Sequence, residues 1–289
     1  MTDTFSFETA DGRTLCVDSN GDVLGKPILT FHGSPGSRLT SFGLAEQAAS
    51  MSVRLLSYDR PGYGRSTAQP DRSVVDCVDD VSRIADGLKI GRFAVLGVSG
   101  GGPHALATAA LLPDRVTAVA TLCGLGPMAE PGFDPWAGMP PAREAELRVF
   151  HDDPAQFRLN LQKMRERYLG LTDEQIVMQH AKAPSPANLP LDYFRGVIAR
   201  VKLGLASSAE GMWEDHCAHC NPWGFDVTSI VAPTQVWHGG ADENIPHQHA
   251  IWLADKIPLA ELHLVEGESH LSLVANHWSD ALRWLATFR

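Results

Sequence analysis

The chain has 289 residues, of which 44% are hydrophobic and 20% charged, which is ordinary for a globular protein and excludes disordered, collagen-like and coiled-coil chains. The formal net charge of −10 makes nucleic acid and membrane surfaces poor partners, because both are anionic. Five scattered cysteines do not resemble a disulfide framework, and the sequence has neither a signal-peptide pattern nor ~20 consecutive apolar residues, so we expect reduced cysteines and a cytoplasmic protein.

Strands and helices alternate in the first part of the chain. Residues 4–18 alternate in polarity around an Asp-Gly turn and predict a β-hairpin. Short apolar runs then predict strands at 28–31, 53–58, 93–98 and 116–122, with helices at about 38–51, 73–88 and 100–112 between them. This alternation indicates a mostly parallel sheet flanked by helices.

The pattern changes after a linker rich in glycine and proline at 124–135. Residues 140–215 read as helices only, with breaks near 154, 170, 184–190 and 207. A strand at 233–238, a helix at about 246–256, a strand at 260–265 and a helix at about 274–288 follow. We therefore predict a core domain formed by residues 1–126 and 223–289, interrupted by a helical cap at 127–222.

The segment Gly97-Val98-Ser99-Gly100-Gly101 carries the strongest chemical signal. It has the form G-x-S-x-G between a predicted strand and a predicted helix, where a serine is exposed on a sharp turn. Small residues two positions before and after let such a turn close. Ser99 is the candidate nucleophile, although a glycine-rich turn with an incidental serine explains the segment too.

A serine nucleophile needs a base that a third group orients. Asp242 follows the predicted strand at 233–238, and His270 follows the predicted strand at 260–265. Nucleophile, acid and histidine in this chain order are typical of one fold class among serine hydrolases. Taken singly, Asp242 could cap a loop and His270 could be a polar residue at a helix start.

The segment His32-Gly33-Ser34-Pro35-Gly36 follows the first buried strand. A turn there can direct a backbone N–H into the site, so we predict an oxyanion hole formed by the N–H groups of Ser34 and Gly100. An ordinary turn at the end of a strand is the alternative.

Together these segments resemble the α/β-hydrolase superfamily, in the branch with a helical cap. The resemblance covers residues 4–126 and about 223–289, and covers the cap only as a helical insertion. It implies that Ser99, Asp242 and His270 are nucleophile, acid and base, and that the turn beginning at Asp59 is structural. The matching segments are His32-Gly33-Ser34-Pro35-Gly36, Asp59-Arg60-Pro61-Gly62-Tyr63-Gly64-Arg65-Ser66, Gly97-Val98-Ser99-Gly100-Gly101, Gly239-Gly240-Ala241-Asp242-Glu243-Asn244-Ile245-Pro246 and Glu268-Ser269-His270.

The nucleophile narrows the expected chemistry. Relatives that cleave epoxides or carbon–halogen bonds carry Asp where this chain has Ser99, so acyl transfer to water is favoured and the enzyme is expected to be carboxylesterase-like. The segment at 32–36 is also similar to that of proline iminopeptidases, which bind a substrate amine with acidic cap residues. The cap's glutamates are explained equally well as solvated helix faces. Lactone, amide and carbon–carbon bond hydrolysis stay open, as does a non-catalytic small-molecule receptor on this fold.

Two features of the predicted cap bear on ligands. His216-Cys217-Ala218-His219-Cys220 offers four potential metal ligands, but no second ligand pair stands nearby, so we expect a helix end and no metal or cofactor. The cap's aromatic and methionine side chains are expected to pack mainly with one another, and some could line an apolar or aromatic substrate pocket. The expected partner is a small carbonyl compound, and the sequence does not indicate an oligomeric state. These side chains are Phe133, Trp136, Met139, Phe150, Met164, Tyr168, Met178, Tyr193, Phe194, Met212 and Trp213.

Overall fold

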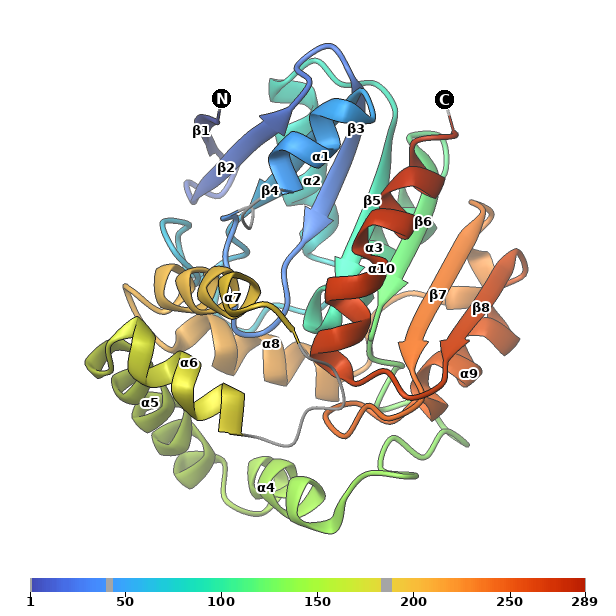
Figure 1. The fold of residues 1–289 in the computed structure, drawn as a ribbon. Coiled ribbons are helices and arrows are strands. Elements are labelled where there is room, and N and C mark those ends of the chain that lie inside the picture. Colours follow the sequence, from blue (N-terminus) through green and yellow to red (C-terminus); the bar gives the residue numbers. More distant parts are fainter. Residues whose placement is uncertain (1, 40–43, 183–188, 289) are drawn as a thin grey trace.

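The computed structural model describes residues 2–39, 44–182 and 189–288 (Figure 1). Within these residues, eight strands form one sheet in the order β1-β2-β4-β3-β5-β6-β7-β8. The β1–β2 hairpin is antiparallel, β2 pairs antiparallel with β4, and the other strand pairs are parallel, as predicted. The strands are β1 (Asp3–Glu8), β2 (Thr14–Gly21), β3 (Lys26–Phe31), β4 (Val53–Tyr58), β5 (Phe93–Val98), β6 (Val116–Leu122), β7 (Thr234–Gly239) and β8 (Ala260–Val265).

Helices cover both faces of this sheet. The central strands are buried on both sides, which is why they read as continuous apolar runs. One apolar core lies between the sheet and α2, α3 and α9, and a second lies between the sheet and α1 and α10. These helices are α1 (Leu44–Ser50), α2 (Cys77–Gly87), α3 (Gly102–Leu111), α9 (Gln248–Lys256) and α10 (His270–Leu285).

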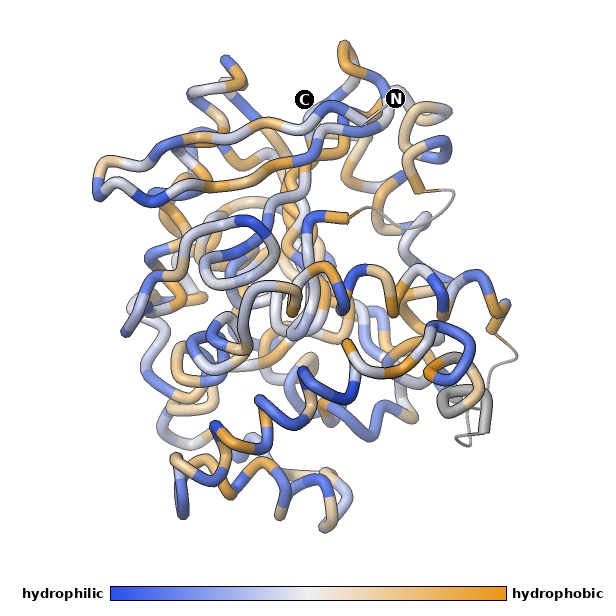
Figure 2. Tube along the Cα trace, turned by 90° about the vertical axis from the view of Figure 1, so that its left-hand side faces the viewer, coloured by the Kyte–Doolittle hydropathy of each residue, from blue (hydrophilic) through white to orange (hydrophobic). Residues whose placement is uncertain are grey.

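Between β6 and β7 the described residues form five further α-helices. They gather at the end of the sheet toward which the parallel strands point (Figure 1). In Figure 2 the helices at the lower end of the molecule alternate between hydrophilic and hydrophobic residues. Their apolar side chains form two small clusters, to which Tyr63 and Leu271 from outside the insertion also contribute. These helices, called here the helical insertion, are α4 (Pro141–Asp152), α5 (Pro154–Gly170), α6 (Asp173–Lys182), α7 (Leu191–Gly204) and α8 (Glu210–Cys220).

The helical nature of the insertion and its breaks at 154, 170 and 207 are confirmed. The break predicted at 184–190 falls mostly on residues 183–188, which lie outside the described residues. Among the described helices, none combines the length and apolar character needed to cross a membrane.

Three predicted helix starts lie four or more residues from the starts of the described helices. The helix predicted over 38–51 is described from Leu44, with 40–43 outside the described residues. Arg38 is not helical, and its backbone N–H donates to Asp59 Oδ1 at 2.8 Å. The helix predicted from 73 begins at Cys77, since the backbone N–H of Ser73 donates to Asp76 Oδ2 at 2.6 Å and forms a turn before it.

The last helix begins at His270, four residues before the predicted position. A capping box causes this earlier start, in which the Ser269 hydroxyl accepts from the Ser272 backbone and the Ser272 hydroxyl accepts from the Ser269 backbone. The sequence prediction relied on apolar periodicity and missed a cap built from two serines. The shift matters because it places His270 at the first position of the helix.

The strand order creates a crevice at one point of the sheet. After β3 the chain crosses to β4 on one side, and then returns past β3 to form β5 on the other side. In open α/β sheets, ligands bind outside the carboxyl ends of the strands at such a reversal. The loops after β3 and β5, which carry Ser34 and Ser99, meet there.

Candidate active site

Ser99 stands on a strained turn between β5 and α3. Its φ of 53° lies in the left-handed region, which is costly for a residue other than glycine. The surrounding glycines are required by space: a Cβ at Gly97 would lie 2.6 Å from the Gly101 carbonyl oxygen, and one at Gly101 would collide with the backbone at the end of β3. The glycines on both sides of Ser99 therefore permit the close backbone contacts that this turn requires.

Asp242 and His270 form a hydrogen-bonded pair. Asp242 lies in the loop after β7, and His270 begins α10 just after β8, so two neighbouring strand ends bring them together. The His270 Nδ1–H donates to Asp242 Oδ2 at 2.7 Å. The other carboxylate oxygen accepts the backbone N–H groups of Asn244 and Ile245, at 2.9 and 3.0 Å, which fixes the orientation of the carboxylate.

The surroundings keep the Asp242 carboxylate charged. Burial by itself raises its pKa, but the interactions with His270 and His238 outweigh burial and hold the pKa below its ordinary value. An ionised carboxylate on Nδ1 leaves the other nitrogen of the His270 ring free to accept a proton. The pair thus has the orientation and charge of a general base with its supporting acid.

One cavity connects these groups. Ser34, Ser99 and His270 all line a cavity of about 200 Å³ at the carboxyl ends of β3 and β5. Gly100 is not among the described lining residues. It is buried and lies against Ser34, since a Cβ at Gly100 would stand 3.0 Å from the Ser34 Cβ. The structure therefore brings Ser34, Ser99, Gly100 and His270 together, with Asp242 behind His270.

A buried ionic cluster lies beneath the Ser34 loop. Asp215, on α8 of the helical insertion, accepts the Ser34 hydroxyl and the Tyr63 hydroxyl, the latter at 2.8 Å. The same carboxylate forms ion pairs with Arg60, at 2.5 Å, and with Arg72. Arg60 also donates to the Ser34 hydroxyl at 2.9 Å. Asp215 thus ties the helical insertion to the loop that carries the predicted oxyanion donor.

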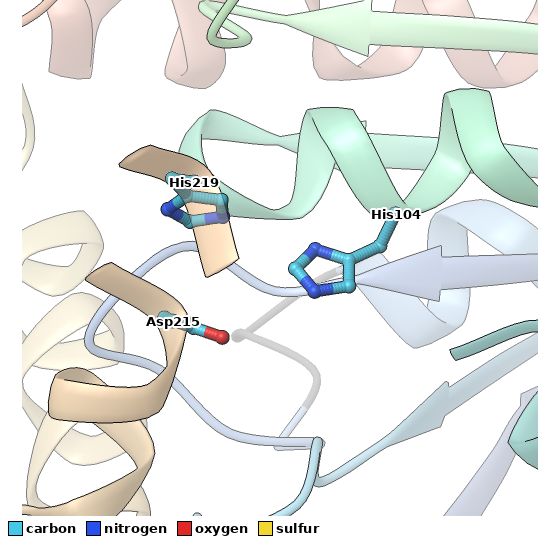
Figure 3. A group of neighbouring side chains, drawn as sticks. All are labelled: His104, Asp215 and His219. Atoms are coloured by element: carbon cyan, nitrogen blue, oxygen red, sulfur yellow. The ribbon is translucent and has the colours of Figure 1, made fainter. Parts of the chain in front are cut away.

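A second connection runs from α8 to the turn at Ser99. His219 Nε2–H donates to the Gly100 carbonyl oxygen at 3.0 Å, and His104 Nδ1–H donates to the same oxygen at 3.1 Å. Figure 3 shows His104 on α3 and Asp215 and His219 on α8, with the three side chains near one another. One nitrogen or oxygen of each lies within 4.8 Å of the others, a spacing that a cation could use.

Charge makes this cluster better suited to positioning than to metal binding. Two guanidinium groups already contact Asp215, so an added cation would be repelled. Both imidazoles already use a ring N–H on the Gly100 carbonyl. The expectation that the protein needs no metal or cofactor stays a prediction.

The segment from His216 to Cys220 is the end of α8, as predicted. Its members have separate surroundings: His216 packs against Phe150 and Phe157, whereas His219 reaches Gly100. Cys217 and Cys220 are free and partly buried, and the other cysteines, Cys16, Cys77 and Cys123, are free and buried.

Acidification is expected to destabilise the protein through His219. Burial lowers the pKa of His219 from 6.5 to about 4, against the opposing effect of the nearby Asp215. Between these pH values the unfolded chain binds a proton that the folded chain does not, so stability falls as the pH drops from about 6.5 to 4. In His219→Gln, the loss of Tm from pH 7 to pH 4.5 should be smaller than in the wild type. An equal loss in both proteins would contradict this role of His219.

The turn beginning at Asp59 is structural in its contacts, as the resemblance implies. Asp59 is fully buried. Its oxygens accept the Arg38 guanidinium at 2.6 Å and the Arg65 backbone N–H at 2.9 Å. These partners hold the loops after β3 and β4 against each other.

Sequence reasoning missed several residues that line the cavity or support the loops at its edge. Arg60, Arg72 and Asp215 come from distant segments, and no motif signals their meeting. Of the aromatic and methionine side chains in the insertion, Tyr193 lines the cavity with Ser99, together with Arg200 from the same helix. Most of the others described pack within the insertion, which confirms the packing interpretation for them.

Comparisons with known proteins agree with the fold. A family profile described as alpha/beta hydrolase fold matches residues 26–276. The chain is 33% identical to the uncharacterized hydrolase YcgS of Bacillus subtilis, but only over 37% of each chain. It is 27% identical to a proline iminopeptidase of Neisseria gonorrhoeae, over 86% of this chain and 84% of that protein.

A solved structure extends this likeness to nearly the whole chain. A thermophilic esterase from Thermogutta terrifontis superposes with a TM-score of 0.67 at 20% identity, covering 99% of this chain and 98% of that one. At this identity the match concerns the fold. The chain spans little more than a third of the length of the first curated relatives it matches, with shares of 37% and 34%. Since the family profile covers most of the sequence, from β3 into α10, the chain belongs to the α/β-hydrolase fold family.

Proposed function

We propose that the protein is a serine hydrolase that cleaves an ester or a related carbonyl substrate through an acyl-enzyme. One observation carries the proposal: Ser99, on its strained turn, and His270, hydrogen-bonded to buried Asp242 at 2.7 Å, line the same cavity. This combination has the features of a nucleophile, a general base and the acid that orients the base.

In the proposed reaction, His270 takes the proton of the Ser99 hydroxyl as its oxygen attacks the substrate carbonyl. Asp242 stabilises the imidazolium that forms. The backbone N–H groups of Ser34 and Gly100 stabilise the tetrahedral oxyanion. His270 then gives its proton to the leaving group, and water hydrolyses the acyl-enzyme by the reverse sequence of proton transfers.

The proposed oxyanion hole gains support from the contacts around it. Ser34 is held through its hydroxyl by Asp215 and Arg60. Gly100 is held through its carbonyl by His104 and His219. Donors that are fixed before the reaction stabilise developing charge without a further cost of reorganisation. In this arrangement residues 127–222 act as a cap, and α7 and α8 bring its side chains to the cavity and to the oxyanion segments.

The cavity lining disfavours a peptidase that binds a substrate amine. Such a site needs carboxylates to pair with the ammonium group, but no aspartate or glutamate occurs among the described residues that line the cavity. The arginines among these described lining residues are Arg38 and Arg200. An ester, a lactone or a substrate of carbon–carbon bond hydrolysis fits these surroundings better than an N-terminal amine.

A substrate panel tests the proposal. We expect p-nitrophenyl and naphthyl esters of increasing acyl length to be hydrolysed, and proline p-nitroanilide to be a poor substrate. A fluorophosphonate should label Ser99. Labelling without turnover of any ester would indicate a competent triad with a selective cap, whereas absence of labelling would favour the non-catalytic receptor.

Asp242→Asn should lower kcat by about 10⁴-fold while changing KM little. An amide at this position can donate to Nδ1 and so stabilise the unproductive tautomer of His270. Steady-state assays with the best ester of the panel measure kcat and KM of this variant. Asp255→Asn, an exposed aspartate on α9, is the matched control. Wild-type kcat in Asp242→Asn would remove Asp242 from the mechanism.

A further inference from the structure

Arg200 differs from the buried arginines of this protein in its partners. Arg13, Arg38, Arg60 and Arg72 are buried, and each pairs with at least one carboxylate. Arg200 is half-buried on α7 of the insertion. The phenol of Tyr193 is the polar group that interacts with it, and no acidic side chain of the described residues forms an ion pair with it.

The phenol satisfies only part of the guanidinium. The Tyr193 hydroxyl donates to the Leu271 carbonyl oxygen at 3.1 Å, so its oxygen is available to accept one N–H from Arg200. A guanidinium has five N–H donors and a full positive charge. A neutral phenol cannot balance that charge, and burial lowers the pKa of Arg200. The remaining donors and the charge are left for another partner.

Arg200 lies at the cavity that holds the proposed nucleophile. Arg200 and Tyr193 line the same cavity as Ser99 and His270. Arg38, the other arginine of this lining, is already neutralised by Asp18 at 3.0 Å and Asp59 at 2.6 Å. Arg200 therefore supplies the one uncompensated guanidinium among the described lining residues, and it faces a space that would also hold the substrate.

We infer that the natural substrate carries a carboxylate, which Arg200 binds with the support of Tyr193 while the scissile carbonyl lies at Ser99. This inference rests on the proposed hydrolase function and specifies its substrate class. A carboxylate matches the planar fork of a guanidinium with two parallel hydrogen bonds. It also supplies a counter-charge that the described residues do not provide in this part of the cavity.

The apolar residues nearby describe the rest of such a substrate. Val197, Val201, Leu271 and Trp278 line the cavity between α7 and α10. A hydrocarbon or aromatic portion between the carboxylate and the ester would contact them. The inferred substrate is thus a carboxylate joined through an apolar spacer to a hydrolysable carbonyl.

Two matched pairs of esters test the inference. In the first pair, p-nitrophenyl hydrogen glutarate and p-nitrophenyl glutaramate differ in an acyl chain that ends in a carboxylate or a carboxamide. In the second, 4-acetoxybenzoate and 4-acetoxybenzamide carry the same difference on the leaving group. In at least one pair, kcat/KM of the wild type should favour the carboxylate by about tenfold to a hundredfold.

The variants assign the preference to Arg200. In Arg200→Gln the ratio of the two kcat/KM values should fall to about one, and Arg200→Lys should retain part of it. Arg195→Gln is the matched control, because Arg195 lies on the same helix but is exposed and pairs with Asp192. Its ratio should equal that of the wild type. An unchanged ratio in Arg200→Gln, or a wild-type preference for the carboxamides, would overturn the inference.

A binding measurement separates this inference from the proposed function. Methyl hydrogen glutarate and methyl glutaramate are titrated by calorimetry into Ser99→Ala, with and without Arg200→Gln. Stronger binding of the carboxylate that Arg200→Gln removes supports the inference even where no ester is hydrolysed. Equal binding of the two compounds to Ser99→Ala overturns it even where Ser99-dependent hydrolysis establishes the hydrolase. If Arg200→Gln fails to fold, the comparison of the two compounds on Ser99→Ala alone decides.

Discussion

Ser99→Ala is expected to reduce kcat/KM for the best ester of the panel by about 10⁴-fold or more. Loss of the hydroxyl removes the attacking oxygen, and neither His270 nor the proposed oxyanion donors can replace it. The protein should still fold, because alanine keeps the backbone of the turn and leaves its close contacts unchanged. Steady-state assays and circular dichroism of the same preparations measure both effects. Undiminished hydrolysis by folded Ser99→Ala would refute the assignment of the nucleophile.

The same position offers a control on stability. Ser99 has a φ of 53°, where any residue with a Cβ is strained. Ser99→Gly should therefore be as inactive as Ser99→Ala but more stable than that variant by about 1 kcal/mol. Urea unfolding of the two variants gives the difference. Equal or lower stability of Ser99→Gly would show that the turn does not store the strain that its backbone angle indicates.

Asp215→Asn is expected to produce the largest loss of stability, about 3–5 kcal/mol in the free energy of unfolding. The carboxylate and its partners Arg60 and Arg72 are almost completely buried, with side-chain exposures of 1%, 0% and 3%. An asparagine has nearly the same shape but no charge, so it would leave two buried guanidinium groups without a counter-charge. Chemical denaturation at neutral pH measures the effect.

The matched control for Asp215→Asn is Asp192→Asn. Asp192 also pairs with an arginine, Arg195 at 2.7 Å, but its side chain is 78% exposed. Exposed ion pairs contribute only about 0–1 kcal/mol, so this variant should resemble the wild type. If the two substitutions cost the same, burial would not govern the contribution of the Asp215 cluster.

The catalytic candidates could be predicted because local signals mark them. Ser99 stands among glycines that a sharp turn requires, and Asp242 and His270 each follow an apolar strand. Once the strands are recognised as parallel and adjacent, their carboxyl ends must meet. The structure joins Asp242 and His270 at 2.7 Å and places His270 and Ser99 on one cavity, as this reasoning expects.

The contacts of the helical insertion could not be predicted in this way. Asp215 and Arg60 are 155 residues apart in sequence, and neither lies in a pattern that indicates a distant partner. Helical periodicity predicted the helices of the insertion but not which of their faces would meet the sheet. Arg200 likewise stands in an amphipathic helix, and only its neighbours in space show that no carboxylate of the described residues pairs with it.

The attachment of α8 determines how this protein could be recombined with its relatives. An exchange of the whole segment between two strands is one way to transfer substrate preference from a relative. Here such an exchange between β6 and β7 would also remove Asp215 and His219, which hold the Ser34 loop and the Gly100 carbonyl. A chimera joined between α7 and α8 would import foreign lining residues and retain the native supports of the turn at Ser99. Helix α8 belongs to the insertion by its place in the sequence. In a chimera, however, α8 should come from the same parent protein as the sheet.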